Sequence, residues 1–313
     1  MRVLVFGGTG YIGTYLIKEL VASGNTVDAF IRRETAADAV RALGANPVLG
    51  SLDVLDDVLA GVDAVDAVIW AAQLMLEDER RVVGAMLDRL KGSGKAFIFT
   101  GGTSLLSRPT NGDWDENSYG EDDPFQPRRQ IAPRLEIENM VRAASENGFR
   151  PMCIRPSLVW GNGGSQIIRD FYHSAKATGS VCYIGRGLNV YTNVHVEDVA
   201  VMYRLMLERG VAGALYHAAS GEASYGVMAR EIARHLGVGT RSVTIEQGID
   251  IWDKFMAGVV LCSCSKVRAP RARSELGWAP HEDRLDILED CLHPAYAEGD
   301  RPSPSWVRTP AAN

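Results

Sequence analysis

Glycines near the start of the chain have the spacing of a phosphate-binding turn. In the segment GGTGYIG, residues 7–13, Gly7, Gly10 and Gly13 recur at every third position, and Gly8 also fits the pattern G-x-G-x-x-G. An apolar run precedes this segment and a helical pattern follows it. Glycine lets the backbone turn tightly and approach a pyrophosphate, to which the helix start offers free N–H groups. The segment predicts a dinucleotide site. The expected contacts are Gly7, Thr9, Gly10, Tyr11, Ile12 and Gly13.

Two arginines follow the second apolar run, at the place that distinguishes the two nicotinamide dinucleotides. The run covers residues 26–31, and Arg32 and Arg33 come directly after it. An acid about 20 residues after the glycines would bind the ribose 2′-OH, whereas an arginine there accommodates a 2′-phosphate. Asp28 lies in mid-strand, where it should not reach the ribose. The sequence therefore favours NADP over NAD, unless both arginines are only solvated loop charges.

The cysteines do not form a recognisable metal site. There are five of them, an odd number without a C-x-x-C pair. Cys262 and Cys264 are one residue apart, but no second pair and no histidine cluster lies near them in the sequence. We expect them to be small buried side chains, and we expect neither disulfides nor a bound metal.

Composition limits the classes of partner. The 313 residues are 46% hydrophobic and 23% charged, which is typical of a globular protein with a large core. The net charge is −6 and no Lys/Arg run is present, so nucleic acid is not an expected partner. The first apolar stretch, residues 3–6, is too short for a signal segment or a membrane span. We expect a cytoplasmic protein that binds a small molecule, without membrane contact.

Alternating strand and helix patterns must hold the phosphate turn in place. Apolar, β-branched runs occupy residues 2–6, 26–31, 67–72, 96–100 and 151–161, and helical patterns include residues 77–90 and 134–148. Apolar strands that alternate with helices indicate a parallel sheet covered on both faces. The predicted fold class is α/β, a Rossmann-type doubly wound parallel sheet with a smaller C-terminal substrate domain.

The predicted domain boundary lies near residue 160. Residues 1–160 are expected to form the dinucleotide-binding domain. Residues 161–313 are expected to form mainly the substrate domain, with segments from about 188 to 218 returning to the first domain. Residues 101–127 interrupt the alternation, and a loop of this length within a compact domain is usually functional or disordered. The tail, residues 301–313, is expected to be irregular.

Seven segments spread over nearly the whole chain carry a family resemblance. They are GGTGYIG (7–13), AGVDAV to WAA (60–72), FIFTGG (97–102), EDDPFQP (121–127), IRPSLVWG (154–161), VHVEDVA (194–200) and SELGWAP (274–280). With these segments the chain resembles extended or atypical short-chain dehydrogenases/reductases of the NAD-dependent epimerase/dehydratase type. The resemblance implies a Rossmann domain, a smaller substrate domain and often a homodimer, built here on the helices at 77–90 and 134–148, unless the apolar positions of these helices belong to the ordinary core.

The resemblance also implies a catalytic Tyr-x-x-x-Lys, which this chain lacks. In the family the lysine lowers the pKa of the phenol, and the tyrosine exchanges a proton with the reacting oxygen. Counting back from LEIEN places Gln130 at the tyrosine position and Arg134 at the lysine position, and no Tyr-x-x-x-Lys occurs between residues 101 and 160. Glutamine has no ionisable proton and arginine stays protonated. We therefore expect dinucleotide binding without the usual proton relay.

Other side chains are candidates for the missing role. Thr103, near the exit of the strand at 96–100, is expected to hydrogen-bond the substrate oxygen, unless it only stabilises the turn. Tyr119, in the long loop, is a candidate relocated phenol, with simple loop packing as the alternative. Tyr191 and His195 lie in a segment that borders the substrate pocket in relatives, although a structural role is the favoured interpretation of His195.

The resemblance places further contacts along the dinucleotide. Ser51 replaces an adenine-contacting Asp of relatives, so Leu52 or Asp53 is expected to share that role. Small residues should let the cofactor lie against the fourth strand, and the segment after the strand at 151–156 should pass the nicotinamide mainly through its backbone. The expected contacts are Ser51, Leu52, Ala71, Ala72, Thr100, Arg134, Pro156, Ser157 and Val159.

Three functions follow from these observations. The first is an NADP(H)-dependent reductase of a small organic substrate. Reduction of a conjugated C=C or an imine needs the lost tyrosine less than ketone reduction does, because charge in an enolate is spread out and Gln130, Arg134 or Thr103 can stabilise it. The second is a nucleotide-sugar epimerase or dehydratase, with Tyr119 as its base. The third is a non-catalytic NADP-binding regulatory protein, which ranks below the first because the substrate-domain segments persist.

Overall fold

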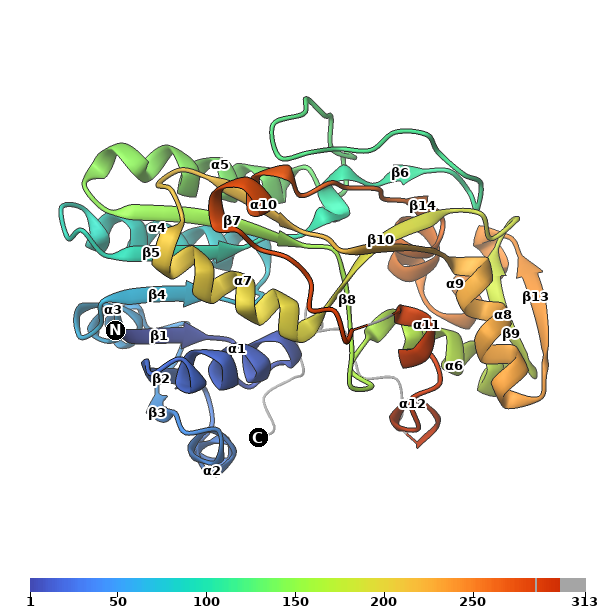
Figure 1. Ribbon diagram of the computed structural model, residues 1–313, viewed down its shortest axis with the longest axis horizontal. Coiled ribbons are helices and arrows are strands. Elements are labelled where there is room, and N and C mark those ends of the chain that lie inside the picture. Colours follow the sequence, from blue (N-terminus) through green and yellow to red (C-terminus); the bar gives the residue numbers. More distant parts are fainter. Residues whose placement is uncertain (285, 299–313) are drawn as a thin grey trace.

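In the computed structural model, which describes residues 1–284 and 286–298, seven parallel strands form one sheet (Figure 1). Their order is β11-β7-β5-β4-β1-β2-β3. The strands are β1 (Arg2–Phe6), β2 (Thr26–Ile31), β3 (Asn46–Leu49), β4 (Ala67–Trp70), β5 (Ala96–Thr100), β7 (Arg150–Pro156) and β11 (Leu215–Ala218). The strand order reverses between β1 and β4, which creates a crevice at the carboxyl ends of these two strands. The predicted α/β class with a Rossmann-type sheet is confirmed.

Helices cover both faces of this sheet (Figure 1). One face carries α1 (Tyr11–Ala22), α2 (Ala37–Ala42), α7 (Val196–Arg209) and α10 (Pro270–Leu276), and the other carries α3 (Leu55–Asp63), α4 (Leu76–Leu90) and α5 (Pro133–Ala143). Successive strand residues point to opposite faces, so Val3 and Val5 enter one apolar core while Leu4 and Phe6 enter the other.

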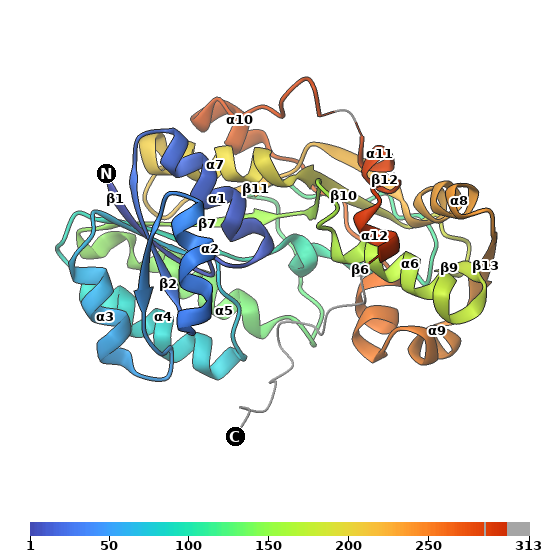
Figure 2. The same cartoon turned by 90° about the horizontal axis from the view of Figure 1, so that it is seen from below.

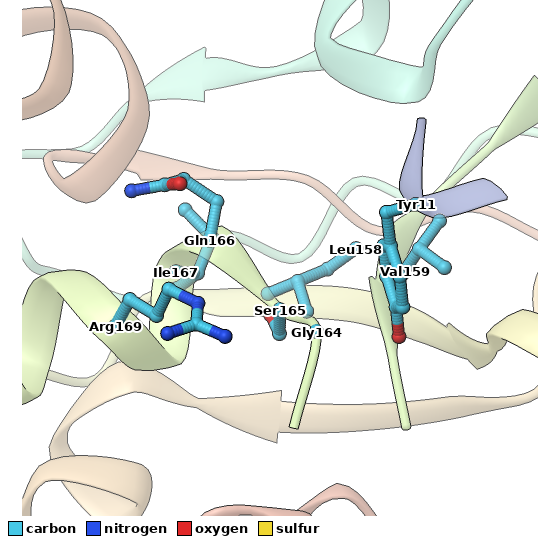
Figure 3. A pocket seen from close by; sticks show the side chains of 8 residues that line it. All are labelled: Tyr11, Leu158, Val159, Gly164, Ser165, Gln166, Ile167 and Arg169. Carbon is cyan, nitrogen blue, oxygen red and sulfur yellow. The ribbon is translucent and has the colours of Figure 1, made fainter. Parts of the chain in front are cut away.

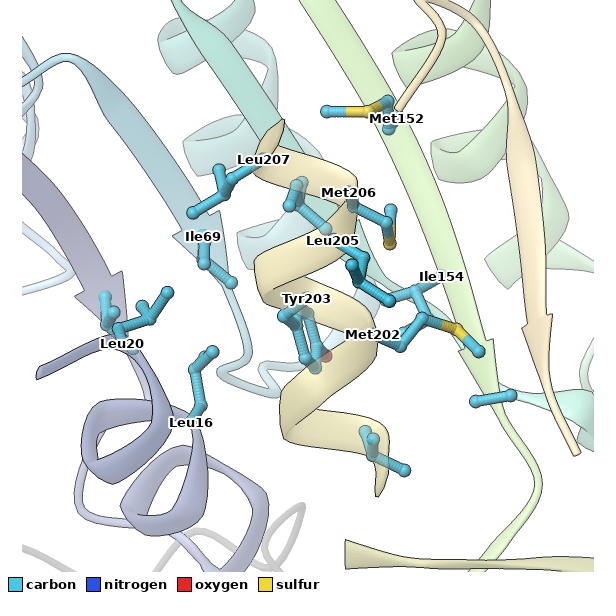
Figure 4. Close-up of a cluster of buried hydrophobic side chains, with 14 of the residues drawn as sticks. Leu16, Leu20, Ile69, Met152, Ile154, Met202, Tyr203, Leu205, Met206 and Leu207 are labelled. Atoms are coloured by element: carbon cyan, nitrogen blue, oxygen red, sulfur yellow. The ribbon is translucent and has the colours of Figure 1, made fainter. Parts of the chain in front are cut away.

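The packing of α1 against α7 fixes the start of α1 at the crevice. Leu16 and Leu20 of α1 are buried with Ile69 of β4 on one side of α7, while Met202 and Met206 of α7 point to the other side, towards Ile154 of β7 (Figure 4). Full burial of one such side chain contributes roughly 1.5–3 kcal/mol. The helix that begins with the glycine segment is therefore held firmly on the sheet.

The remaining elements lie beside the carboxyl ends of the main sheet and have their own apolar core (Figure 2). Three small sheets have the strand orders β12-β10-β8, β13-β9 and β14-β6. The strands are β6 (Arg108–Pro109), β8 (Leu158–Trp160), β9 (Ser180–Ile184), β10 (Val190–His195), β12 (Gly221–Ser224), β13 (Gly239–Val243) and β14 (Ser263–Cys264). The helices are α6 (Gln166–Thr178), α8 (Tyr225–Leu236), α9 (Ile245–Ile251), the π-helix η4 (Met256–Leu261), α11 (Ile287–Asp290) and α12 (Ala295–Glu298). Between residues 188 and 218, β11 joins the main sheet, whereas β10 pairs with β8 and β12.

Most predicted elements lie where their patterns placed them, and the departures have local causes. The helix predicted over 134–148 ends as α5 at Ala143, and a 3₁₀ turn, η3 (Ala144–Asn147), completes it before Gly148 turns the chain with a φ of +72°. The run at 151–161 divides at Ser157 into β7 and β8, which belong to different sheets.

The long loop at 101–127 is ordered by partners that are distant in the sequence. It contains η2 (Thr103–Leu106) and β6, and Tyr119 forms a bridge to Val267. The tail at 301–313 lies outside the described residues. Among those described, no helix is both long enough and apolar enough to cross a membrane.

Candidate active site

The glycine segment forms a turn in which side chains do not fit. Gly7 has a φ of +83°, and a Cβ added there would stand 2.7 Å from the backbone N of Ala72. A Cβ added at Gly13 would stand 2.7 Å from the Cα of Gly8. Backbone atoms cannot yield as the end of a side chain can, so both positions require glycine. The segment Ala71–Ala72, which follows β4, lies directly against this turn.

The start of α1 fits the pyrophosphate of a dinucleotide. Gly10 is the N-cap, no side chain caps the helix, and its first turn carries no acidic residue. Thr9 and Gly10 are exposed, and Ile12 is half-buried. The first N–H groups and the partial positive charge of the helix are thus available to a phosphate. These are the features that NAD or NADP requires of its cradle.

Tyr11 has a second role that its place in the motif did not reveal. Its phenol donates a hydrogen bond of 2.6 Å to the carbonyl of Gly161, and burial raises the pKa of this phenol well above its ordinary value. The Tyr11 ring also packs against Gly164, where a Cβ would overlap it. The side chain therefore joins the glycine turn to the turn that follows β8.

The end of β2 brings Arg32 and Arg33 beside the glycine turn. Phe6 and Phe30 are register partners, so the residues after the two strands share one edge of the sheet. Both arginines are exposed, and neither forms an ion pair with a residue that the structure describes. Asp28 is buried and accepts hydrogen bonds from Arg2 Nε at 2.7 Å and from Asn46, as its mid-strand position predicts.

The residues after β3 and β5 are largely held by the protein itself. The Ser51 N–H donates to the Asp57 carboxylate at 2.9 Å, and Leu52 is buried in the core under α3 and α4. The Thr100 hydroxyl lies 2.6 Å from the phenol oxygen of Tyr203 on α7. Thr100 therefore has a partner inside the domain before any ligand binds.

The start of α5 carries Gln130 and Arg134, as the alignment of the motif predicts. Gln130 is exposed in the turn before the helix, and Arg134 is half-buried in the first turn. Burial raises the pKa of Glu79 and of Glu138, and the nearby Arg134 guanidinium offsets part of that rise. The structure thus places a permanent cation near two buried carboxyls, at the position that the sequence predicts to replace the family's lysine.

A buried ion pair joins α5 to the main sheet below this point. The Arg155 guanidinium of β7 binds the Glu138 carboxylate of α5 at 2.7 and 2.8 Å, and both side chains are at most 2% exposed. A Cβ on Gly101, just after β5, would collide with this carboxylate. The pair therefore sets the position of α5 relative to the exits of β5 and β7.

A cavity of about 210 Å³ opens at these strand exits, and we call it the tyrosine cavity. Its lining residues are Gly102, Thr103, Ser104, Pro156, Ser157, Leu158, Ile167, Tyr191, Tyr225 and Val260, none of which is charged. Tyr191 and Tyr225 are stacked with ring centroids 6.1 Å apart. The structure thus brings Thr103, Pro156, Ser157 and Tyr191, four of the predicted site residues, to one neutral pocket.

A second cavity of about 400 Å³ adjoins the first and shares Leu158 and Ile167 with it; we call it the arginine cavity (Figure 3). Its lining residues are Tyr11, Leu158, Val159, Gly164, Ser165, Gln166, Ile167 and Arg169. The Arg169 guanidinium donates to the carbonyl of Gly163 at 2.8 Å and pairs with no carboxylate among the described residues. The cavity combines this charge with the uncapped start of α6, so it favours an anionic group.

Four of the predicted catalytic and substrate-binding residues line neither cavity: Gln130, Arg134, Tyr119 and His195. Tyr119 hydrogen-bonds through its backbone with Lys266 and Arg268, and its phenol lies near the Arg108 guanidinium. His195 is the N-cap of α7, where its Nδ1 accepts from the N–H of Glu197, and its ring packs against Gly161. The structure does not bring either side chain to the pocket, and His195 has the structural role that the sequence favoured.

Several lining residues had no signal in the sequence. Tyr225 begins α8, Val260 belongs to the π-helix η4, and Arg169 follows the Gly-rich turn at 161–164 by one helical turn. Arg128 anchors η4, since its guanidinium donates to the carbonyls of Gly258 and Val259 at 3.0 Å. The Gly-rich turn at 161–164 is the one sequence feature that points to the region of Arg169. In the described residues, no group of acidic, histidine or cysteine side chains is arranged to hold a metal.

Comparison with known proteins gives one consistent result. The model of the NAD dependent epimerase/dehydratase family matches residues 3–219. An uncharacterized protein of Schizosaccharomyces pombe is 30% identical over 309 residues, which cover 95% of this chain and 100% of that protein. A 4-hydroxy-2-methyl-3-oxo-4-farnesyl-3,4-dihydroquinoline-1-oxide ketoreductase of Stigmatella aurantiaca is 29% identical over 238 residues, 71% of this chain and 69% of the relative.

The fold is also similar to solved structures. A dTDP-glucose 4,6-dehydratase of Bacillus anthracis, crystallised in complex with NAD, superposes with a TM-score of 0.73 at 15% identity. The superposition covers 95% of this chain and 96% of that one. At this level of identity the likeness concerns the fold alone.

Proposed function

The chain belongs to the NAD dependent epimerase/dehydratase family, and from this premise we propose that it is an NADP(H)-dependent reductase of a small, neutral carbonyl compound or enone. As a member it is an NAD(P)-dependent oxidoreductase. The observation that carries the proposal is the tyrosine cavity, an uncharged pocket at the exits of β5 and β7. The proposals for the cofactor and for the substrate rest on different parts of the molecule.

The cofactor proposal rests on the glycine turn and on Arg32 and Arg33. The turn and the start of α1 fit the pyrophosphate that NAD and NADP share. The two arginines support NADP over NAD, because they are exposed, unpaired within the described residues and follow β2, after which a ligand for a 2′-phosphate is expected. NADPH bound in this cradle would supply a hydride at the carboxyl ends of the strands.

The substrate proposal rests on the size and lining of the tyrosine cavity. At about 210 Å³ it is smaller than the roughly 300–1,000 Å³ of drug-sized sites. Leu158, Ile167 and Val260 give it apolar walls, while hydroxyl groups supply its polarity. A charged group would lose its hydration there without gaining a counter-ion. A small neutral ring or chain with one oxygen suits the pocket.

The reaction class follows from the groups that are missing at α5. No phenol stands at the Gln130 position, and arginine holds a positive charge but cannot pass on a proton. Reduction of a simple ketone leaves a localised alkoxide that needs a proton at once. Reduction of an enone spreads the charge into an enolate, which hydroxyl donors such as Thr103 stabilise until water protonates it. We therefore expect enones to react faster than saturated ketones.

The test is a comparison of substrates under identical conditions. NADPH oxidation would be followed with 2-cyclohexen-1-one, cyclohexanone and a cyclic imine. Turnover of UDP-glucose, which an epimerase or dehydratase converts without net oxidation of the cofactor, would be followed by chromatography of the sugar nucleotide. The proposal predicts turnover of the enone or imine above that of the ketone, and none with the sugar nucleotide. Turnover of cyclohexanone or UDP-glucose alone would reject the preference, and a failure to oxidise NADPH with any of them would reject the reductase.

The arginine cavity supports a second candidate, a nucleotide-sugar epimerase or dehydratase. Arg169, Ser165 and the start of α6 form a region suited to a phosphate, beside the neutral cavity that would then hold the sugar. Tyr119, the base that this function would need, lies outside both cavities. Calorimetric titration with UDP tests the candidate: it predicts binding that an Arg169→Met variant loses and an Arg186→Met variant keeps, since Arg186 is exposed and remote from the cavity lining.

A further inference from the structure

The Gly-rich turn, residues 161–164, contacts both the cofactor cradle and the C-terminal part of the described chain. A Cβ on Gly164 would overlap the ring of Tyr11, so these two residues are in direct contact. A Cβ on Gly163 would stand 2.5 Å from Nδ1 of His293, and Gly163 has a φ of +71°. The turn therefore has one close neighbour in the cradle and another about 130 residues further along the chain.

Asp290, the last residue of α11, holds this turn by its backbone. One oxygen of the buried Asp290 carboxylate accepts a hydrogen bond from the N–H of Gly161 at 3.1 Å, and the other accepts from the N–H of Gly163 at 3.0 Å. The buried phenol of Tyr296 donates to the first of these oxygens at 2.5 Å. Hydrogen bonds to a carboxylate are about twice as strong as those between neutral groups. A single side chain thus fixes two residues of the turn and is itself fixed by a phenol.

Gly161 connects Asp290 to the cofactor cradle. Its N–H donates to Asp290, and its carbonyl accepts the hydrogen bond of 2.6 Å from the phenol of Tyr11. Tyr11 is the first residue of α1, directly after the N-cap Gly10. The N–H groups at this helix start are the ones that remain available for a pyrophosphate. A shift of Gly161 would therefore move the Tyr11 side chain and, with it, the first turn of α1.

We propose that Asp290 is a positioning residue for the dinucleotide: it fixes Gly161, Gly161 fixes the Tyr11 side chain, and Tyr11 begins the helix that binds the pyrophosphate. The inference requires only that the protein binds a nicotinamide dinucleotide, and it does not depend on the substrate proposed above. The competing explanation is that Asp290 only stabilises the apolar core to which α11 and α12 belong. The two explanations differ in the cofactor affinity of folded variants.

The experiment measures the affinity of the full chain for NADPH and for NADH by calorimetry, in the absence of substrate. Asp290→Asn keeps the size of the side chain but has one acceptor oxygen where the carboxylate has two. It should bind both dinucleotides roughly fivefold more weakly than the wild type does, as expected for the loss of one hydrogen bond. The two affinities should fall equally, because the pyrophosphate is common to both dinucleotides.

A double-mutant cycle tests the route through Tyr11. Tyr11→Phe removes only the phenol oxygen that donates to Gly161, and it should weaken the binding of both dinucleotides to a similar extent. If Asp290 acts through Tyr11, the variant with both substitutions should bind no more weakly than the weaker of the two single variants.

The matched control is Tyr172→Phe, which removes a buried hydroxyl in the same apolar core. The hydrogen bond of the Tyr172 phenol, 2.8 Å long, goes to the carbonyl of Cys291 and not to the Gly-rich turn. This variant should lower Tm by roughly 2 °C and leave the affinity for both dinucleotides unchanged.

An unchanged dinucleotide affinity of folded Asp290→Asn would overturn the inference, and so would additive effects in the double variant or normal binding by Tyr11→Phe. If Asp290→Asn does not fold, Tyr296→Phe replaces it in the cycle, because it removes the phenol that donates to the Asp290 carboxylate. Tyr296→Phe should weaken the binding of both dinucleotides at least about twofold, and an unchanged affinity would again contradict the inference.

A wild type that binds neither dinucleotide would refute the inference together with its premise. A failed reductase assay with normal dinucleotide binding would reject the proposed substrate class alone, so the two failures remain distinguishable.

Discussion

The glycine turn and the tyrosine cavity lie at the same edge of one sheet, but they are built in different ways. The turn is shaped by backbone: Gly7 lies against Ala72 and Gly13 against Gly8, with no room for a Cβ. The cavity is lined largely by side chains, and the nearby exits of β5 and β7 are held to α5 by the ion pair of Arg155 with Glu138. A site shaped by backbone admits only one residue type at each critical position, whereas a site shaped by side chains tolerates substitution of its residues. This explains how the cradle persists while the family's Tyr and Lys are replaced.

The first prediction concerns the buried ion pair that holds α5 against β7. Arg155→Met should lower the free energy of unfolding by about 3–5 kcal/mol, because it leaves the Glu138 carboxyl buried without its partner. Urea titration measures the loss. The matched control is Arg80→Met, which breaks a surface pair of Arg80 with Glu136 and should cost less than about 1 kcal/mol.

A double variant sharpens the same test. Adding Glu138→Leu to Arg155→Met removes the stranded carboxyl and should recover most of the lost stability. If Arg155→Met lowers the free energy of unfolding no more than Arg80→Met does, the buried ion pair does not support this edge of the sheet. The contrast between side-chain support there and backbone support at the glycine turn would then be lost.

The second prediction concerns His217, which stands beside Arg155 in the register of β11 and β7. Burial, followed by the Arg155 charge, lowers its pKa to about 4. Since the ordinary value is near 6.5, the unfolded chain binds more protons between these two values. The free energy of unfolding should therefore rise with pH from about 4 to 6.5, by roughly 3 kcal/mol, with the full contribution present above that range.

Urea titrations at pH 5 and pH 7.5 measure this dependence. His217→Gln should flatten it, because glutamine does not titrate. His235→Gln, at an exposed histidine on α8, should leave it unchanged. An equally steep dependence in His217→Gln and the wild type would assign the effect to other groups.

The third prediction turns to the glycine turn. Gly13→Ala places a Cβ against the Cα of Gly8, and relief of that overlap must displace the turn. At the upper cost of overpacking, about 3 kcal/mol, the affinity for NADPH should fall roughly a hundredfold. Fluorescence titration with NADPH measures it.

Gly84→Ala is the matched control for this substitution. A Cβ at Gly84, in α4, meets no atom within 4 Å, so the variant should bind NADPH normally and be slightly more stable. Normal NADPH binding by Gly13→Ala would show that the turn accommodates side chains, and the cradle would then not be a site that backbone alone defines.

The difference between the backbone-shaped glycine turn and the side-chain-lined cavity also determines how much of the structure the sequence predicts. The main sheet and the cradle could be predicted, because apolar runs of strand length and glycines at three-residue spacing each have one simple physical cause. Tyr225 and Val260 could not, because no spacing in the chain connects α8 and η4 with the exit of β5; tertiary packing alone brings them there. Tyr119 shows the converse, since a phenol in a promising loop is held elsewhere by the segment around Val267.

The fourth prediction concerns Arg32 and Arg33, whose side chains lie beside the glycine turn. Arg32→Ser and Arg33→Ser should each weaken NADPH binding by roughly tenfold and leave NADH binding unchanged, because each removes one charge-assisted contact to the 2′-phosphate. Arg41→Ser is the control, as Arg41 pairs with Asp38 on the surface of α2. Asp28 cannot substitute as a ribose ligand while Arg2 and Asn46 hold its carboxylate. Tighter binding of NADH than of NADPH by the wild type would therefore refute the role of both arginines, while leaving the backbone cradle intact.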